Sequence, residues 1–287
     1  MDKSFERALD NLTRYGNSFG APSKTRSHWT RDLDFHIKDA RRQPVHYLWF
    51  VGDFASYDAR AREATCAAAR VFHQAGLDFG ILYDGESNSG NDIGLAGQEG
   101  LFEKLRGKNL RSFAGARFEE ILTTDPHSFQ ALKYDYFDPR RAKPVWHHSQ
   151  ILADLVESGT VNVRHHSRLA VTYHDPCYLG RYSGIFGAPR RLIAALGLKL
   201  VEMPRNRTYA YCCGAAGGRI WMDDPPAIPD HPALARVREA AMLQHVHILA
   251  VACPKDLVMF QDALRATGLE GKLAIKELSQ LVEEAIG

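Results

Sequence analysis

Residues 210–222 read AYCCGAAGGRIWM and place two adjacent cysteines, Cys212 and Cys213, directly before a glycine-rich turn. Adjacent cysteines rarely form a disulfide with each other, because the required geometry strains the peptide between them. The chain has five cysteines, and the other three are Cys66, Cys177 and Cys253. An odd number in a long chain argues against a disulfide framework. The adjacent pair therefore indicates a role other than a structural bridge.

The composition is that of an ordinary soluble globular protein, with 287 residues of which 45% are hydrophobic and 24% charged. This length allows one large domain or two domains of ordinary size. The formal net charge is +2 and basic residues are scattered in pairs, which argues against a nucleic-acid partner. The start, MDKSFERALDNL, lacks the apolar region of a signal peptide, and no stretch approaches the roughly 18 apolar residues of a membrane span. We therefore expect a cytoplasmic protein without a transmembrane segment.

Short apolar runs alternate with helical patterns along the chain. The apolar runs occupy residues 46–53, 78–84, 118–125, 168–177, 198–204 and 247–254. Helical patterns of ten residues or more occupy residues 58–76, 188–197 and 233–245. Such alternation predicts parallel βαβ units and an α/β fold.

Three landmarks recur at matching intervals in the two halves of the chain. They are Asp53, Asn88-Ser89-Gly90 and Asp125-Pro126-His127-Ser128 in the first half, and Cys177, Cys212-Cys213-Gly214 and Cys253-Pro254-Lys255-Asp256 in the second. In each half, 34 residues separate the first landmark from the second; 35 and 39 residues then separate the second from the third. This regularity predicts an internal duplication of about 125 residues, with these cysteines in one copy only.

Each landmark follows a predicted strand or opens a turn. Loops at the carboxyl ends of parallel strands form one face of a sheet, so Cys177, Cys212, Cys213 and Cys253 can converge there. Convergent thiolates are soft ligands that suit an iron–sulfur cluster or zinc. The following glycines allow close approach of the backbone and offer N–H groups to cluster sulfides.

Three other interpretations stay open for these residues. The glycine-rich turn is a weak match to a phosphate-binding loop, because no Lys-Ser/Thr pair follows it. A structural zinc site usually uses cysteine pairs with the spacing Cys-x2-Cys, which is absent here. The cysteines can also be buried without a ligand. Cys66 stands apart in an Ala-rich helical pattern and is predicted to be a small buried residue.

At these residues the sequence resembles the cysteine-rich CCG domain, whose pattern is Cys, Cys-Cys-Gly and Cys-Pro-x-Cys. That domain occurs twice in the catalytic subunit of heterodisulfide reductase and in related iron–sulfur oxidoreductases. The second family copy resembles YHDPCYLGRYSGIFGAPRR, VEMPRNRTYAYCCGAAGGRIWM and VACPKDL; the first resembles FVGDFASYDARARE, LAGQEGLFEKL, TTDPHSFQALK and HHSQILADLVESG without its cysteines. The resemblance implies two duplicated Rossmann-like domains, 44–165 and 166–287, related by pseudo-two-fold symmetry. An N-terminal extension, 1–43, precedes them.

The resemblance also implies a ligand set for one 4Fe–4S cluster, either cubane or non-cubane. Its members are Cys177, Cys212, Cys213 and Cys253. Asp256 stands where the family has its last cysteine and is a further candidate ligand through oxygen. The first copy has Asp53, Asn88, Ser89, Asp125 and Ser128 at the cysteine positions, and oxygen ligands hold iron–sulfur clusters poorly. That half is expected to be a scaffold, with a polar pocket of Asp53, Asp125, His127 and Ser128 as the alternative.

Four further polar residues are candidates for catalysis. His174, Asp175 and Arg181 surround Cys177, and Arg219 follows the glycines. Such groups can hydrogen-bond a substrate sulfur or offset cluster charge. Alternatively, they cap strands and helices.

The resemblance implies an iron–sulfur component of a heterodisulfide-reductase-like complex, an oxidoreductase acting on thiol, disulfide or persulfide groups, for example in cytoplasmic sulfur oxidation. Its partners would be a ferredoxin-type iron–sulfur subunit and a flavoprotein subunit, with a lipoate-carrying protein as a candidate substrate. One alternative is an electron-transfer subunit of a lactate or glycerol-3-phosphate oxidation system. Another is a non-redox assembly module that binds zinc.

Overall fold

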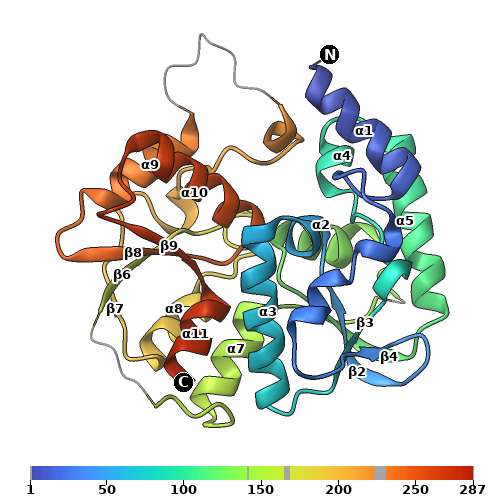
Figure 1. Cartoon of the computed structure of the whole chain (residues 1–287), viewed down its shortest axis with the longest axis horizontal. Helices are drawn as coiled ribbons and strands as arrows, with labels where there is room; N and C mark the ends of the chain where they lie inside the picture. Colours follow the sequence, from blue (N-terminus) through green and yellow to red (C-terminus); the bar gives the residue numbers. More distant parts are fainter. Residues whose placement is uncertain (1, 141, 165–168, 223–230, 287) are drawn as a thin grey trace.

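The computed structural model describes residues 2–140, 142–164, 169–222 and 231–286. It contains two parallel sheets with helices packed around them (Figure 1). The first sheet consists of β1 (Lys38–Asp39), β2 (Val45–Phe50), β3 (Phe79–Ile81), β4 (Phe118–Thr123) and β5 (Val145–His147). The second consists of β6 (Ala170–Tyr173), β7 (Lys199–Leu200), β8 (Val246–Val251) and β9 (Ala274–Glu277). The predicted α/β class with parallel strands is therefore confirmed.

The two sheets have closely similar topologies. Their strand orders are β1-β3-β2-β4-β5 and β7-β6-β8-β9. Apart from β1, each half places its first strand beside its second on one side and beside its third on the other. This is the arrangement that an internal duplication predicts. The duplication and its pseudo-two-fold axis remain predictions.

The expected N-terminal extension contributes a strand to the first sheet. Strand β1 pairs in parallel with β3 and forms an edge of the first sheet. The expected boundary between residues 165 and 166 lies outside the described residues.

Helices cover both faces of each sheet. The longer ones are α1 (Lys3–Tyr15), α3 (Ala59–Gln74), α5 (Glu99–Ala114), α7 (His148–Glu157), α8 (Gly187–Ala195), α9 (Pro232–Ala241), α10 (Pro254–Thr267) and α11 (Leu278–Ile286). Short helices α2 (Asp53–Tyr57), α4 (Asn91–Leu95) and α6 (Pro126–Gln130) begin near the landmarks of the first half. Among the described residues, no helix is both long and apolar enough to span a bilayer.

Local sequence signals set where several helices begin and end. The Asp58 carboxylate accepts hydrogen bonds from the first backbone N–H groups of α3, and Asp2 does the same for α1. Pro254 begins α10, where its missing N–H costs nothing, and Gly268 ends that helix in the left-handed conformation.

The strands are buried on both faces, because successive side chains point to opposite sides. In β8, Leu249 and Val251 pack with the core that α9 and α10 cover. The intervening Ala250 packs in the other core, which α8 and α11 cover. Continuous apolar strands of this kind are typical of parallel sheets between helical layers.

The two halves share one apolar core. Helix α3 packs against α10 and α11, while α7 packs against α8 and α11 (Figure 1). Trp49 and Leu152 of the first half belong to the same buried cluster as Leu192 and Leu281 of the second. Such a continuous core holds the halves in a fixed relation, so that loops from both can build one site.

Candidate functional site

Three of the expected ligands form a hydrogen-bonded group of sulfurs. Cys177 follows β6, and Cys212 and Cys213 lie in the loop before α9. The thiols of Cys177 and Cys213 hydrogen-bond to Cys212, whose Sγ also accepts the backbone N–H of Gly214 at 3.3 Å. The fold thus brings together cysteines that lie far apart in the sequence, as predicted from the strand ends.

Gly214 has a conformation that requires glycine. Its φ is 87°, and a Cβ added there would lie 2.6 Å from Cε1 of His231. Glycine therefore lets the backbone after the cysteine pair pass close to a ring while its N–H points at a sulfur.

The pKa values of the four cysteine thiols shift in different directions. Hydrogen bonds from Cys177 and Cys213 lower the pKa of the Cys212 thiol, and the same bonds raise the pKa of the Cys177 and Cys213 thiols. Burial raises the pKa of Cys253 well above its usual value. Cys212 therefore ionises more readily than the other three thiols.

Cys253 lies at the boundary of the two halves, at the start of α10. Its Sγ and one ligand atom each of Asp125 and His127 lie within 4.8 Å of one another, and all three residues are buried. Two members of the predicted polar pocket therefore adjoin the cysteine site. Ser128 lies beside them and donates to Asp125 Oδ2 at 2.7 Å, whereas Asp53 belongs to a different network.

Asp256 is buried beside the cysteines. Its Oδ2 has no hydrogen-bond partner among the residues that the structure describes, and it lies 3.6 Å from His174 Nε2. Burial raises the pKa of Asp256 to about 7. A buried carboxyl oxygen without a donor is costly, so a bound group beside it would be stabilising.

His174 is held as a neutral ring. Arg236 Nε donates to His174 Nδ1 at 3.1 Å, and burial together with the Arg236 charge lowers the pKa of His174 well below its usual value. Because Nδ1 accepts, the ring proton sits on Nε2, the nitrogen that faces Asp256.

The other candidates for catalysis have mainly structural contacts. Asp175 forms a two-pronged ion pair with Arg190, at 2.7 and 2.9 Å. Arg181 donates to the backbone oxygens of Thr208 and Ala210 and so fixes the loop before the cysteine pair. Arg219 begins a short turn, Arg219–Trp221, after the glycines. The contacts of Asp175 and Arg181 are thus structural, but they hold a loop rather than cap a strand or helix as the alternative expected.

Asp92, which sequence reasoning missed, links the two halves next to the cysteines. Its carboxylate accepts from Gly217 N–H at 3.1 Å, lies 3.1 Å from His127 Nδ1, and pairs with Lys255. Burial alone would raise the pKa of Asp92, but Lys255 and His127 lower it. The available signal was the repeat: His127 and Lys255 occupy the same place in the two proline-containing turns.

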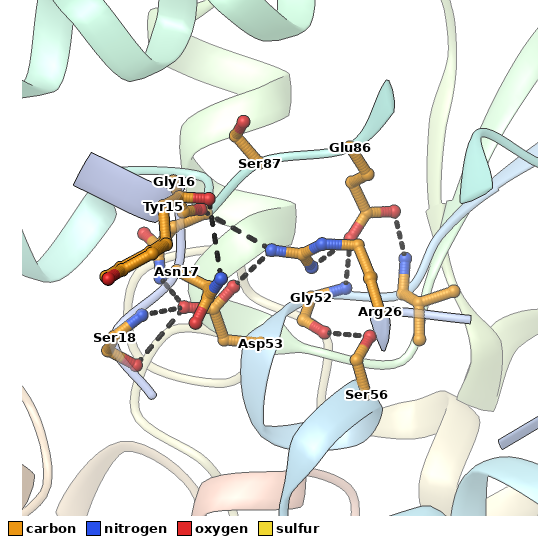
Figure 2. Close-up of polar contacts among 12 residues, drawn as sticks. Tyr15, Gly16, Asn17, Ser18, Arg26, Gly52, Asp53, Ser56, Glu86 and Ser87 are labelled. Carbon is orange, nitrogen blue, oxygen red and sulfur yellow. Dashed lines mark hydrogen bonds and ion pairs between the residues drawn. The ribbon is translucent and has the colours of Figure 1, made fainter. Parts of the chain in front are cut away.

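Asp53, the residue that the predicted duplication aligns with Cys177, forms an internal ion pair with Arg26, shown in Figure 2. Arg26 Nη2 donates to Asp53 Oδ1 at 2.7 Å, and its Nη1 donates to Glu86 Oε1 at 2.8 Å. The other oxygen of Asp53 accepts from Ser18 N–H at 2.8 Å and from Asn88 Nδ2 at 2.7 Å. The landmark residues Asp53 and Asn88 thus bond to the protein itself.

Glu86 completes this network. Its carboxylate accepts the backbone N–H groups of Val51 and Gly52 at 2.9 and 2.8 Å. Arg26, Asp53 and Glu86 are all buried. Burial alone would lower the pKa of Arg26, but Asp53 and Glu86 raise it. This buried network, in which Arg26 Nε has no partner among the described residues, favours the scaffold interpretation of the first half.

A pocket of about 380 Å³ is lined in part by Tyr178, the residue after Cys177. Tyr178 and Tyr182 form part of its wall, with ring centroids 5.2 Å apart, and Tyr178 packs edge-on against His127 at 4.7 Å. Tyr182 is 61% exposed, whereas Tyr178 is buried. The Tyr182 ring therefore lies at the surface, and the Tyr178 ring lies buried beside it.

The donor set fits an iron–sulfur cluster. Cys177 and Cys213 both hydrogen-bond to Cys212, and Cys253 is close enough to Cys177 to influence its pKa; all four can act as soft thiolate ligands. The N–H of Gly214 directed at Cys212 Sγ is a polar group of the kind that surrounds cluster ligands. Asp125 and His127 beside Cys253 offer harder donors at one end of the group.

Comparison with known proteins supports the same assignment. Residues 171–261 match the family model of the cysteine-rich domain, CCG. A probable iron–sulfur-binding oxidoreductase of Bacillus subtilis is 33% identical over all of this chain and 41% of its own length. A probable membrane-anchored ferredoxin of Chromohalobacter salexigens is 37% identical over 97% of this chain and 41% of its own.

Heterodisulfide reductase is also represented among these relatives. One subunit of the dihydromethanophenazine:CoB–CoM heterodisulfide reductase of Methanosarcina barkeri is 30% identical over 96% of this chain and 66% of its own length. The chain spans about two fifths of the first two relatives. The chain therefore contains a CCG cysteine-rich domain over residues 171–261 and is related to iron–sulfur oxidoreductases and a heterodisulfide reductase subunit.

Proposed function

We propose that this chain is the iron–sulfur portion of an oxidoreductase and holds one 4Fe–4S cluster on Cys177, Cys212, Cys213 and Cys253. The convergence of these four cysteines on one site carries the proposal. A bound cluster would supply one-electron transfer at this site. The buried Arg26 network around Asp53, the residue that the predicted duplication aligns with Cys177, supports a single cluster for the described part of the chain.

The residues around the cysteines would hold and shield the cluster. Gly214 N–H would stabilise negative charge on sulfur, and Asp92 would fix the glycine loop through Gly217. His174, with its proton on Nε2, would orient the Asp256 carboxyl. Tyr178 would separate the site from solvent at the 380 Å³ pocket.

The proposed reaction is electron transfer coupled to thiol, disulfide or persulfide chemistry. The heterodisulfide reductase relative and a pocket lined by Tyr178, the residue after Cys177, support it. A ferredoxin-type subunit and a flavoprotein subunit would be the partners, and a lipoate-carrying protein is a candidate substrate. We place this activity in the cytoplasm as part of the proposal.

A second candidate is electron transfer alone, as in lactate or glycerol-3-phosphate oxidation systems. The relative named as a membrane-anchored ferredoxin supports it, since ferredoxins carry electrons without chemistry on a substrate. The two candidates differ in whether electrons leave through a sulfur compound. An anaerobic assay of the reduced protein with a disulfide acceptor decides between them.

Protein purified without air is expected to contain about four irons and four sulfides per chain, because one ligand set is complete. Metal and sulfide analysis on the purified chain measures this. About eight irons would contradict the scaffold role of the first half. Zinc without iron would instead support the zinc-binding assembly module, for which Asp125 and His127 beside Cys253 are the specific observation.

Replacing Asp256 by alanine is expected to leave all the iron in place and to shift only the reduction potential. Four thiolates suffice for a 4Fe–4S cluster, and the Asp256 carboxyl then acts through the field it places beside Cys213. Iron counting and redox titration under anaerobic conditions measure both quantities. Asp262→Ala, an exposed carboxylate later on the same helix, is the matched control. Loss of one iron per cluster in Asp256→Ala would identify Asp256 as a ligand.

A further inference from the structure

A second, larger pocket lies in the first half, away from the cysteines. Its volume is about 830 Å³, and it is lined by the end of α1, the turn at Ser23–Thr25, the loop after β3 and the last turns of α5. The lining residues are Arg14, Tyr15, Pro22, Ser23, Lys24, Asp84, Gly85, Ser87, Lys108, Arg111 and Ser112. In parallel α/β sheets, the space beyond the carboxyl ends of the strands is where small ligands bind, and the β3 loop lies there.

The positive charges of this pocket exceed its negative ones. Among the described residues, no carboxylate pairs with Lys24, Lys108 or Arg111. The single acidic residue of the lining, Asp84, already pairs with Arg41 at 2.9 Å. Three cations therefore face the pocket without compensation.

Helix α5 contributes its cations from one face. Lys104, Lys108 and Arg111 follow each other at spacings of four and three residues, which places them side by side on the helix. Burial and the charges of Lys104 and Arg111 lower the pKa of Lys108. Like charges so arranged destabilise an isolated helix, and an anionic ligand would remove that cost.

The end of α1 at Gly16 lies beside the hydroxyl of Ser87 and the ammonium of Lys108. Gly16 ends α1 with φ 72°, and a Cβ added there would lie 2.8 Å from Ser87 Oγ and 3.9 Å from Lys108 Nζ. The hydroxyl and the ammonium thus face one space. Tyr15, which is 44% exposed, offers a ring at the rim.

From these features we propose that the pocket binds a phosphorylated small molecule of about nucleotide size. Lys24, Lys108 and Arg111 would contact its phosphate groups, with Ser87 as a hydroxyl donor. The volume lies within the range of pockets that bind small molecules. A concave, hydroxyl-bearing wall suits a small phosphorylated ligand better than it suits the surface of an acidic protein partner. The site is independent of the cluster proposed above.

Calorimetric titration of the whole chain with pyrophosphate and with ADP tests this site. We expect saturable binding of both, weakened at least about tenfold in Lys108→Gln/Arg111→Gln, because each lost charge-assisted contact costs on the order of 1 kcal/mol or more. Lys272→Gln removes an exposed charge in the second half and is expected to bind both probes like the parent chain.

Four outcomes would overturn the proposal. They are no binding of either probe, equal binding by the parent and the double variant, binding only to vesicles of anionic lipid, and binding only to a polyglutamate peptide. Thermal unfolding of both variants, read without ligand, shows whether they are folded. Gly16→Ala, whose Cβ would crowd the Ser87 hydroxyl without changing charge, is expected to weaken binding as well.

Discussion

Replacing Cys213 by serine is expected to reduce the iron content from about four atoms per chain to near zero. Cys213 is buried, and its thiol hydrogen-bonds to Cys212. Its replacement would leave the cluster one thiolate short in a site that other ligands cannot reach. Serine oxygen is a poor ligand for a cluster and stays protonated in this buried position. Iron analysis and paramagnetic resonance of anaerobically purified protein measure the loss.

Cys66→Ser is the matched control for this substitution. Cys66 is also buried, but it lies on α3, where its thiol contacts Trp29 O at 3.6 Å and burial raises its pKa to about 11. The prediction that Cys66 is a small buried residue is thereby confirmed. Its serine variant should keep the full cluster signal. An unchanged signal in Cys213→Ser would mean that Cys213 is not a ligand.

Replacing Arg26 by methionine is expected to destabilise the fold by about 3–5 kcal/mol, because it leaves two buried carboxylates without their cation. Asp53 and Glu86 both bond to Arg26 and have almost no exposure to solvent. Denaturant unfolding of the apo chain measures the change. Arg14→Met, in an exposed pair with Asp10, should change stability by only about 0–0.5 kcal/mol.

The pH dependence gives a further check on Arg26→Met. Unpaired buried carboxylates have a folded-state pKa above the unfolded value, so they destabilise at high pH and their cost falls as they protonate. Burial already raises the pKa of Glu86 with Arg26 present. The deficit relative to the parent should therefore shrink as the pH falls from about 8 to about 5. A constant deficit would show that lost packing, not charge, explains the destabilisation.

Several elements follow directly from local patterns in the sequence. The apolar run at 46–53 contains most of β2, the Ala-rich pattern at 58–76 contains α3, and the run at 247–254 contains most of β8. Helix α5 was missed, although it is as long as α3. Its polar, lysine-rich sequence carries only a weak apolar stripe, so periodicity gave little signal.

By itself, the sequence determined the fold class, the parallel strands and the candidate ligands at Cys177, Cys212, Cys213 and Cys253. Strand alternation, helical spacing and repeated turns are local properties that survive without knowledge of packing. Only the tertiary structure decided which side chains complete the sites. Asp92 meets Lys255 across 163 positions of sequence, and Arg26 meets Glu86 across 60. The packing of both halves around one core determines which residues pair. A buried charge is stable only beside a counter-charge, and that counter-charge can come from a distant part of the sequence.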